Sequence, residues 1–139
     1  MPRYSNRSAI KLAECDDRIQ RVFNKVIDAI DHTVLVGHRD EAAQEEMYDQ
    51  GRSQLQYPNS KHNQFPSQAI DVAPYPIDWN DRERFTLFAG FVLGTAQEMG
   101  IKLRWGGDWD KDFTLEKLEK FIAGYYKKLR KGGTLIIFF

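Results

Sequence analysis

Short strand-like runs and helical segments follow one another irregularly along this chain, and this irregularity restricts its fold more than any other feature. Apolar residues spaced by three and four mark the helices, whereas short β-branched and aromatic runs mark the strands. The regular strand–helix–strand repetition of a parallel sheet is missing. We therefore predict the α+β class.

The helices are expected where apolar spacing is combined with capping residues. A helical segment begins at Ser8, includes Cys15 and shows its clearest spacing over residues 19–30. Asp40 is a candidate cap for the next helix, which Gly51 ends. The predicted helices are residues 8–30, 41–50, 80–99 and 114–131.

The strands are expected in the apolar runs between these helices. The intervening residues 52–67 are polar and contain two prolines, which indicates an exposed loop. The predicted strands are residues 32–38, 68–73, 101–105 and 134–139.

Composition excludes several classes of protein. A length of 139 residues predicts one domain, residues 1–139, that buries about two-thirds of its unfolded surface. Twenty basic and twenty acidic residues cancel, so no net charge draws the chain to nucleic acid. The single cysteine excludes an internal disulfide framework and a cysteine-rich zinc site. The first residues lack an apolar core, so no signal peptide is expected, and no apolar run suits membrane insertion.

His62 and Asp71 are the candidate metal ligands. They are nine positions apart, which places them on opposite faces of any single helix, but they can converge if His62 ends a loop and Asp71 lies on the following strand. An imidazole and a carboxylate both suit zinc. Two alternatives stay open: His62 is a solvated loop residue, or Asp71 bonds to backbone amides or pairs with Arg39.

Two further groups of residues are candidates for a cleft. Arg39 follows a strand and a glycine, so its guanidinium can be aimed at a carboxylate or at the negative charge that develops on a carbonyl oxygen. The alternative is a surface arginine paired with Asp40 or Glu41. Residues 105–109 place two tryptophans around a glycine pair, which suits either a cleft wall or a tight turn.

The order and spacing of several motifs carry a family resemblance over about residues 34–113. The motifs are Gly37-His38-Arg39 with Gln44, residues 48–53, Ser60-Lys61-His62-Asn63, residues 66–79 around Asp71, and residues 103–109. Together they resemble the zinc D-alanyl-D-alanine carboxypeptidases, and among them the L-alanyl-D-glutamate endopeptidases of phage endolysins. The resemblance implies a Hedgehog-like peptidase fold, with a small antiparallel sheet packed with helices.

The resemblance also implies roles for individual residues. His62 and Asp71 would be the first two zinc ligands, and Arg39 would steady the substrate or its tetrahedral intermediate. The substrate would be a stem peptide of bacterial peptidoglycan, with zinc activating a bound water. The residues expected to contribute to substrate binding are Gln44, Ser60, Asp108 and Trp109.

The chain departs from this family near its C-terminus. Family members end with an acidic general base and then a histidine, the third zinc ligand, on the last strand. Residues 114–139, which diverge from the family, contain no histidine, and their acids, Glu116 and Glu119, lie in a lysine-rich helical pattern. The general base and the third ligand are therefore unknown from the sequence.

Three explanations of this departure are open. An altered C-terminus has destroyed the site; a partner chain supplies the missing ligand; or another residue of this chain completes the metal shell. The candidates for the last case are His38, Asp108, Asp110 and Glu116.

We therefore expect a monomeric zinc peptidase, with peptidoglycan as its partner, that acts at the cell wall. It would be made in the host cytoplasm and then either be released through a holin pore or be delivered as part of a virion. The alternative is an inactive cell-wall-binding or virion structural module on the same fold.

Overall fold

The computed structural model describes residues 2–105. The chain divides into two compact units, Met1–Asn80 and Asp81–Phe139. The predicted helix 114–131 and strand 134–139, together with Asp108, Trp109, Asp110 and Glu116, lie outside the described residues. The prediction of one domain stays a prediction.

The N-terminal segment forms two helices where one was expected, α1 (Asn6–Ala13) and α2 (Asp17–Val26). The chain breaks between them because the Asp16 side chain accepts a hydrogen bond from the Arg18 backbone and so caps α2. Cys15 is buried in this break and forms an isolated parallel bridge with Ser67. The prediction that Cys15 lies within a helix is therefore wrong.

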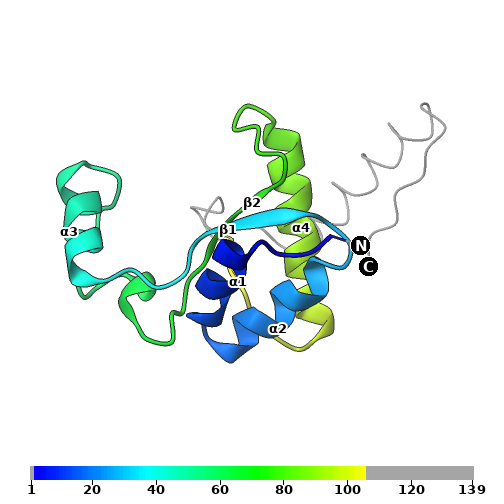
Figure 1. Ribbon diagram of the computed structural model, residues 1–139, viewed down its shortest axis with the longest axis horizontal. Helices are drawn as coiled ribbons and strands as arrows, with labels where there is room; N and C mark the ends of the chain where they lie inside the picture. The colour runs from blue at the N-terminus through cyan, green and yellow to red at the C-terminus, as the bar shows by residue number, and fades with distance from the viewer. Residues whose placement is uncertain (1, 106–139) are drawn as a thin grey trace. The chain divides into compact units, whose positions relative to one another are not determined.

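The core of the first unit lies between these helices and a small sheet. Helix α1 contacts both α2 and strand β1 (His32–Val36) (Figure 1). The buried residues of α2 recur every three or four positions, which gives the helix one apolar face. The buried apolar residues of these elements are Leu12, Ile19, Val22, Phe23, Val26, Val34 and Ala73.

The sheet consists of β1 and the antiparallel strand β2 (Asp71–Pro74), joined in sequence through α3 and a long loop. Val34 pairs with Val72, and Val36 pairs with Asp71, so Leu35 is an extra residue on β1. Such a bulge bends its strand and re-aims nearby side chains. The bulge lies at the end of the sheet that carries Asp71.

Helix α3 (Glu41–Asp49) begins and ends where the sequence predicts. Asp40 caps it by accepting a hydrogen bond from the Ala43 backbone, and Gly51, with φ of 71°, ends it. The Arg52 N–H then donates to the Met47 carbonyl, which is the bond expected when a left-handed residue terminates a helix.

The loop that follows α3 is not simply exposed, as the sequence had suggested. It contains a 3-10 turn, η1 (Lys61–Asn63), and its residues Ser60, His62 and Ser67 are buried. The correction matters because η1 supplies the histidine of the candidate site.

Within the second unit the described residues form helix α4 (Arg82–Glu98), capped by Asp81 and ended by Gly100, with φ of 72°. The prediction of a strand at residues 101–105 is wrong. The Ile101 N–H donates back to the Ala96 carbonyl, so this residue completes the helix C-terminus instead of starting a strand.

Taken together, the described residues confirm the predicted α+β class. None of the helices in residues 2–105 is both long and apolar enough to span a membrane.

Candidate metal and active site

The position of His62 is fixed by the turn that contains it. Ser60 caps η1: its hydroxyl oxygen accepts a hydrogen bond from the His62 backbone at 3.3 Å, while the Asn63 side chain accepts one from the Ser60 backbone at 3.0 Å. The His62 side chain is only 11% exposed. Ser60 therefore contributes to the site by fixing the backbone of His62.

Asp71 reaches the same place from the other side, as the first residue of β2. Its side chain is 49% exposed, so it lies at the boundary between the buried His62 ring and solvent. The His62 Nε2 and Asp71 Oδ1 atoms are 3.2 Å apart. The two candidate ligands, from a turn and a strand, thus face each other.

The other ring nitrogen determines what this pair can hold. His62 Nδ1 lies 2.9 Å from the Gly37 carbonyl oxygen, and since that oxygen can only accept, Nδ1 carries a proton. In a neutral imidazole Nε2 is then an acceptor that faces a carboxylate, which is also an acceptor. A cation has to lie between them, either a second proton on the ring or a metal ion.

The pKa of Asp71 supports the charged form of its carboxyl group. Partial burial alone would raise this pKa, but the hydrogen bond and charge of His62, together with the charge of Arg39, outweigh it and lower the pKa below its ordinary value. Asp71 is therefore ionised beside a protonated His62, and a carboxylate is also the form that would bind a metal.

Arg39 is the third member of the site. Its backbone N–H donates to the His62 carbonyl at 2.8 Å, its Nη1 donates to Gln44 Oε1 at 3.0 Å, and its Nη2 lies 3.5 Å from Asp71 Oδ2. With a side chain only 10% exposed, Arg39 holds the carboxylate from the protein side. The alternative of a surface arginine paired with Asp40 or Glu41 is wrong, because Arg39 is buried and its guanidinium contacts Gln44 and Asp71.

Gln44 anchors this arginine. It is fully buried, and its amide nitrogen donates to the Ser53 hydroxyl at 3.0 Å and to the Leu55 carbonyl at 2.6 Å. Its amide oxygen also accepts from Asn63 Nδ2 at 3.3 Å. Gln44 thus ties α3, the loop and η1 to the guanidinium of Arg39.

Sequence reasoning assigned no role to two groups at this site, the Asn63 side chain and the Gly37 carbonyl. Asn63 could have been found, since Ser60 and Asn63 have the spacing of a capping box. The Gly37 carbonyl carries no side-chain signal at all.

His38, the alternative ligand within the described residues, takes a different position. Its ring stacks edge-on against Phe65 with centroids 5.3 Å apart. Among residues 2–105 no three side chains of His, Cys, Asp or Glu are grouped closely enough to hold a metal ion. The described part of the chain therefore offers two candidate ligands, His62 and Asp71.

The geometry of these two ligands fits zinc. Donors bound at about 2.0–2.1 Å to a tetrahedral zinc ion are separated by about 3.3 Å, close to the 3.2 Å between His62 Nε2 and Asp71 Oδ1. The bond from Nδ1–H to a backbone carbonyl is also the usual second contact of a zinc-bound histidine.

Comparison with known proteins identifies the family of this chain. Residues 1–127 match the model of the phage L-alanyl-D-glutamate peptidase family. The chain belongs to this family. It is similar to the L-alanyl-D-glutamate peptidase of Escherichia phage T5, with 34% identity over 113 residues that cover 78% of this chain and 82% of the relative.

A solved structure extends the likeness to the fold. The crystal structure of the Serratia marcescens L-Ala D-Glu endopeptidase ChiX is similar to this chain with a TM-score of 0.66 and 29% identity, covering 76% of this chain and 80% of that one. The resemblance read from the motifs around Arg39, His62 and Asp71 is thereby confirmed, as are the fold and the peptidase class of this phage L-alanyl-D-glutamate peptidase family member.

Proposed function

We propose that this chain is a zinc-dependent peptidase that hydrolyses the bond between L-alanine and D-glutamate in the stem peptide of bacterial peptidoglycan. The observation that carries the proposal is the His62–Asp71 pair, in which a ring nitrogen and a carboxylate oxygen face each other at 3.2 Å within a member of a peptidase family. Zinc, when bound there, lowers the pKa of a bound water and polarises the scissile carbonyl.

The residues around the pair would keep it in place during turnover. The Gly37 carbonyl holds the His62 ring with Nε2 toward Asp71, and Arg39 holds the second oxygen of Asp71. Because the guanidinium of Arg39 has five donor hydrogens, those that Gln44 and Asp71 do not use can also steady a substrate carbonyl. Gln44 and Ser60 act by fixing Arg39 and His62.

The third ligand would be a carboxylate. No histidine follows His62 in the chain, His38 stacks on Phe65, and His32 is buried against Tyr4. Asp108, Asp110 and Glu116 are the candidates within this chain, and an acid among residues 106–139 would also have to serve as general base. A ligand from a partner chain is the other source.

The proposal is tested by measuring zinc content and catalysis on the same full-length preparations. Wild type is expected to hold one zinc ion per chain and to release new amino termini of D-glutamate from purified peptidoglycan. His62→Ala and Asp71→Ala are each expected to lose the zinc and the release, because each removes one of two identified ligands.

His38→Ala is the matched control for the metal, since it removes the neighbouring histidine and should leave zinc content unchanged. Zinc that stays at wild-type level in His62→Ala would overturn the ligand assignment. Peptidoglycan binding without zinc and without release would instead support the second candidate, an inactive wall-binding module. This candidate is favoured by the absence of a histidine from residues 114–139, where the family has its third zinc ligand.

A further inference from the structure

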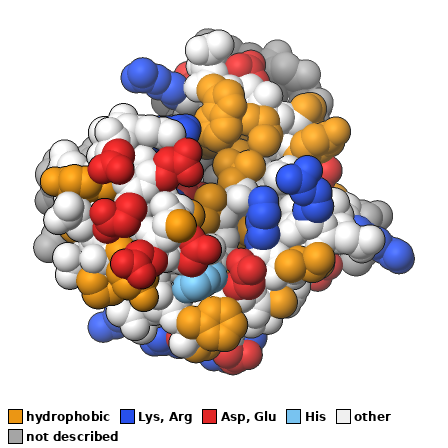
Figure 2. Space-filling view, turned by 60° about the vertical axis from the view of Figure 1, so that its left-hand side comes forward, with side chains coloured by type: hydrophobic (Ala, Val, Ile, Leu, Met, Phe, Trp, Pro, Cys, Tyr) orange, Lys and Arg blue, Asp and Glu red, His pale blue; other side chains and the backbone are white. Residues whose placement is uncertain are grey.

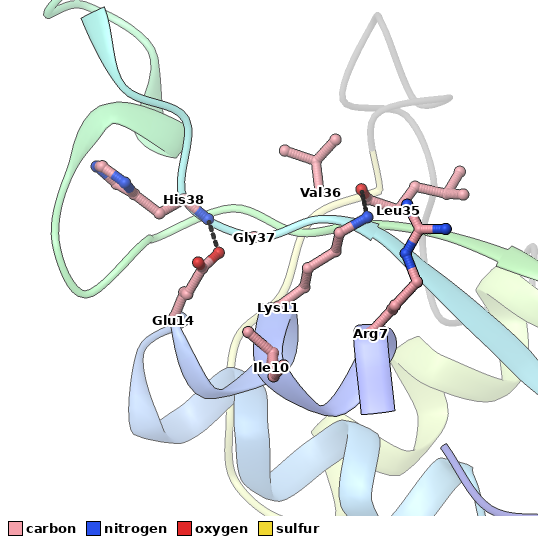
Figure 3. Close-up of a pocket in the computed structure, with 8 residues that line it drawn as sticks. All are labelled: Arg7, Ile10, Lys11, Glu14, Leu35, Val36, Gly37 and His38. Atoms are coloured by element: carbon pink, nitrogen blue, oxygen red, sulfur yellow. Dashed lines mark hydrogen bonds between the residues drawn. The ribbon is translucent and has the colours of Figure 1, made fainter. Parts of the chain in front are cut away.

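A groove lies between helix α1 and the end of strand β1, and Gly37 is one of the residues that line it (Figure 3). Its volume is about 370 Å³, within the range of about 300–1,000 Å³ that is typical of small-ligand sites. It is lined by one stripe of α1 with its C-cap residue, and by the last residues of β1 with the two residues that follow them. The lining residues are Arg7, Ile10, Lys11, Glu14, Leu35, Val36, Gly37 and His38.

Side chains of α1 and of its C-cap residue, Glu14, bind backbone groups of β1 and of the residues that follow it. The Ser8 hydroxyl accepts from the Val34 backbone at 3.1 Å, Lys11 Nζ donates to the Leu35 carbonyl at 2.9 Å, and Glu14 Oε1 accepts from the His38 backbone at 3.1 Å. These bonds fix where the charges of the groove lie.

The two signs of charge are separated along the groove. Figure 3 shows the side chains of Arg7 and Lys11 reaching toward Leu35 at one end, while Glu14 reaches toward His38 at the other. Basic and acidic side chains are both exposed at the surface shown in Figure 2, and their charges cancel over the whole sequence.

These charged groups keep bonding capacity for a ligand. Arg7 is exposed and has no hydrogen bond or ion pair within the described residues. Lys11 uses one of its three donor hydrogens on Leu35, and the bond to His38 uses one of the two oxygens of Glu14. Between the charges, Ile10 is 65% exposed and offers an apolar surface.

We propose that this groove binds a segment of the peptidoglycan stem that carries a carboxylate and an ammonium group separated by an aliphatic chain. Arg7 and Lys11 would bind the carboxylate, Glu14 the ammonium, and Ile10 the aliphatic part between them. The inference rests on the proposed function for the identity of the ligand, and it adds a second substrate-binding surface to the peptidase.

The groove adjoins the metal site through one peptide unit. The ideal Cβ position at Gly37 would contact the Lys11 carbonyl oxygen and Glu14 Oε1, whereas the carbonyl of the same glycine binds His62 Nδ1. A stem segment bound here would therefore lie next to Gly37, whose carbonyl orients the candidate zinc ligand His62.

The test uses γ-D-glutamyl-L-lysine, which has both charged groups but lacks the bond that the peptidase would cut. Titration into the full-length protein is expected to saturate and to move the amide resonances of Gly37 and His38. Arg7→Gln and Glu14→Gln should each weaken binding about threefold to tenfold, since each removes one charge from a partly exposed contact. Glu14→Gln keeps an oxygen for the His38 backbone.

Lys25→Gln, an exposed charge change on α2, is the matched control and should bind as wild type does. Loss of binding on acetylation of the lysine ε-amine or amidation of its carboxyl group supports the two-charge arrangement. Equal binding by inorganic phosphate, or binding that neither Arg7→Gln nor Glu14→Gln weakens, would overturn it.

These experiments can reject the groove proposal and the peptidase proposal independently of each other. Release of D-glutamate amino termini from peptidoglycan without saturable dipeptide binding rejects the groove and keeps the peptidase. Dipeptide binding that depends on Arg7 and Glu14, in a protein without zinc or turnover, rejects the peptidase and keeps the groove as a wall-binding surface.

Discussion

Gln44 lies outside the candidate metal site but helps to hold its residues in place. Its amide group makes hydrogen bonds in both directions, to Arg39 and Asn63 on one side and to Ser53 and Leu55 on the other. Since the residue is fully buried, no water can replace these bonds without opening the structure.

Gln44→Ala is therefore expected to lower the free energy of unfolding by about 2–4 kcal/mol, because it leaves several buried polar groups unpaired and opens a cavity. Urea unfolding measures the change. Gln50→Ala, an exposed change at the end of the same helix, should stay within about 0.5 kcal/mol of wild type. Equal losses in the two variants would contradict the role given to Gln44.

Arg39→Lys tests the residue that lies between Gln44 and Asp71. Lysine keeps the charge but cannot bond to Gln44 and Asp71 with the fork of a guanidinium. We expect catalysis on peptidoglycan to fall about tenfold or more with zinc content largely kept, because both ligands remain. Arg52→Lys, on an exposed residue after α3, is the matched control and should keep wild-type turnover.

At the scale of elements, the meeting of α1 and β1 depends on one glycine. A Cβ at Gly37 would lie too close to the Lys11 backbone oxygen, and neither backbone segment can move aside as a flexible side chain could. This close approach sets the distance between the helix and the strand, and with it the place of the carbonyl that holds His62.

Gly37→Ala is expected to destabilise the fold by about 1–3 kcal/mol through overpacking and to weaken zinc binding by displacing this carbonyl. Thermal unfolding and zinc titration check the two effects. Gly51→Ala serves as the comparison: its φ of 71° also costs about 1 kcal/mol, but nothing lies within 4 Å of its Cβ position, so zinc affinity should not change. Unaltered zinc affinity in Gly37→Ala would contradict the link to His62.

The sequence predicted those elements whose signals are local. Asp40 and Gly51 bound α3, and Asp81 and Gly100 bound α4, because capping and left-handed glycines act within one turn. The bulge at Leu35 and the burial of η1 escaped prediction because both depend on contacts between distant segments.

The candidate site was predictable in part. The motifs named His62, Asp71 and Arg39, which the structure brings together, but not the network through Gln44 and Asn63 that connects them. Every residue has a backbone carbonyl, so residue types cannot indicate which one binds His62. The bond from the Gly37 carbonyl to His62 is therefore visible only in the structure.

At the scale of the first unit, Tyr4 in the N-terminal segment is held by a contact with the buried His32. Tyr4 contacts His32 Nε2 at 2.6 Å and the Phe23 carbonyl at 2.9 Å, and His32 Nδ1 lies 2.8 Å from the Ile30 carbonyl. Burial lowers the pKa of His32 more than the Ile30 carbonyl and the charge of Asp31 raise it.

This shift predicts how stability depends on pH. The unfolded chain, with a histidine pKa of about 6.5, binds a proton that folded His32 does not, so the free energy of unfolding should fall as the pH drops below about 6.5. Urea unfolding at pH 7.5 and 5.5 measures this slope. His32→Phe should reduce the slope, whereas His38→Ala should keep the contribution of His32; an unchanged slope in His32→Phe would contradict the prediction.

The bonds from α1 and Glu14 to the outer edge of β1 also affect whether two copies of this protein can associate through their sheets. A two-stranded sheet ordinarily presents peptide groups along its open edge, where a strand of another molecule can add. Here Ser8, Lys11 and Glu14 already occupy the Val34, Leu35 and His38 backbone groups, and two of the three bring a charge to that edge. Strand β1 is thereby protected on this side from the addition of a strand of another molecule, which lowers the tendency of this chain to aggregate through its sheet.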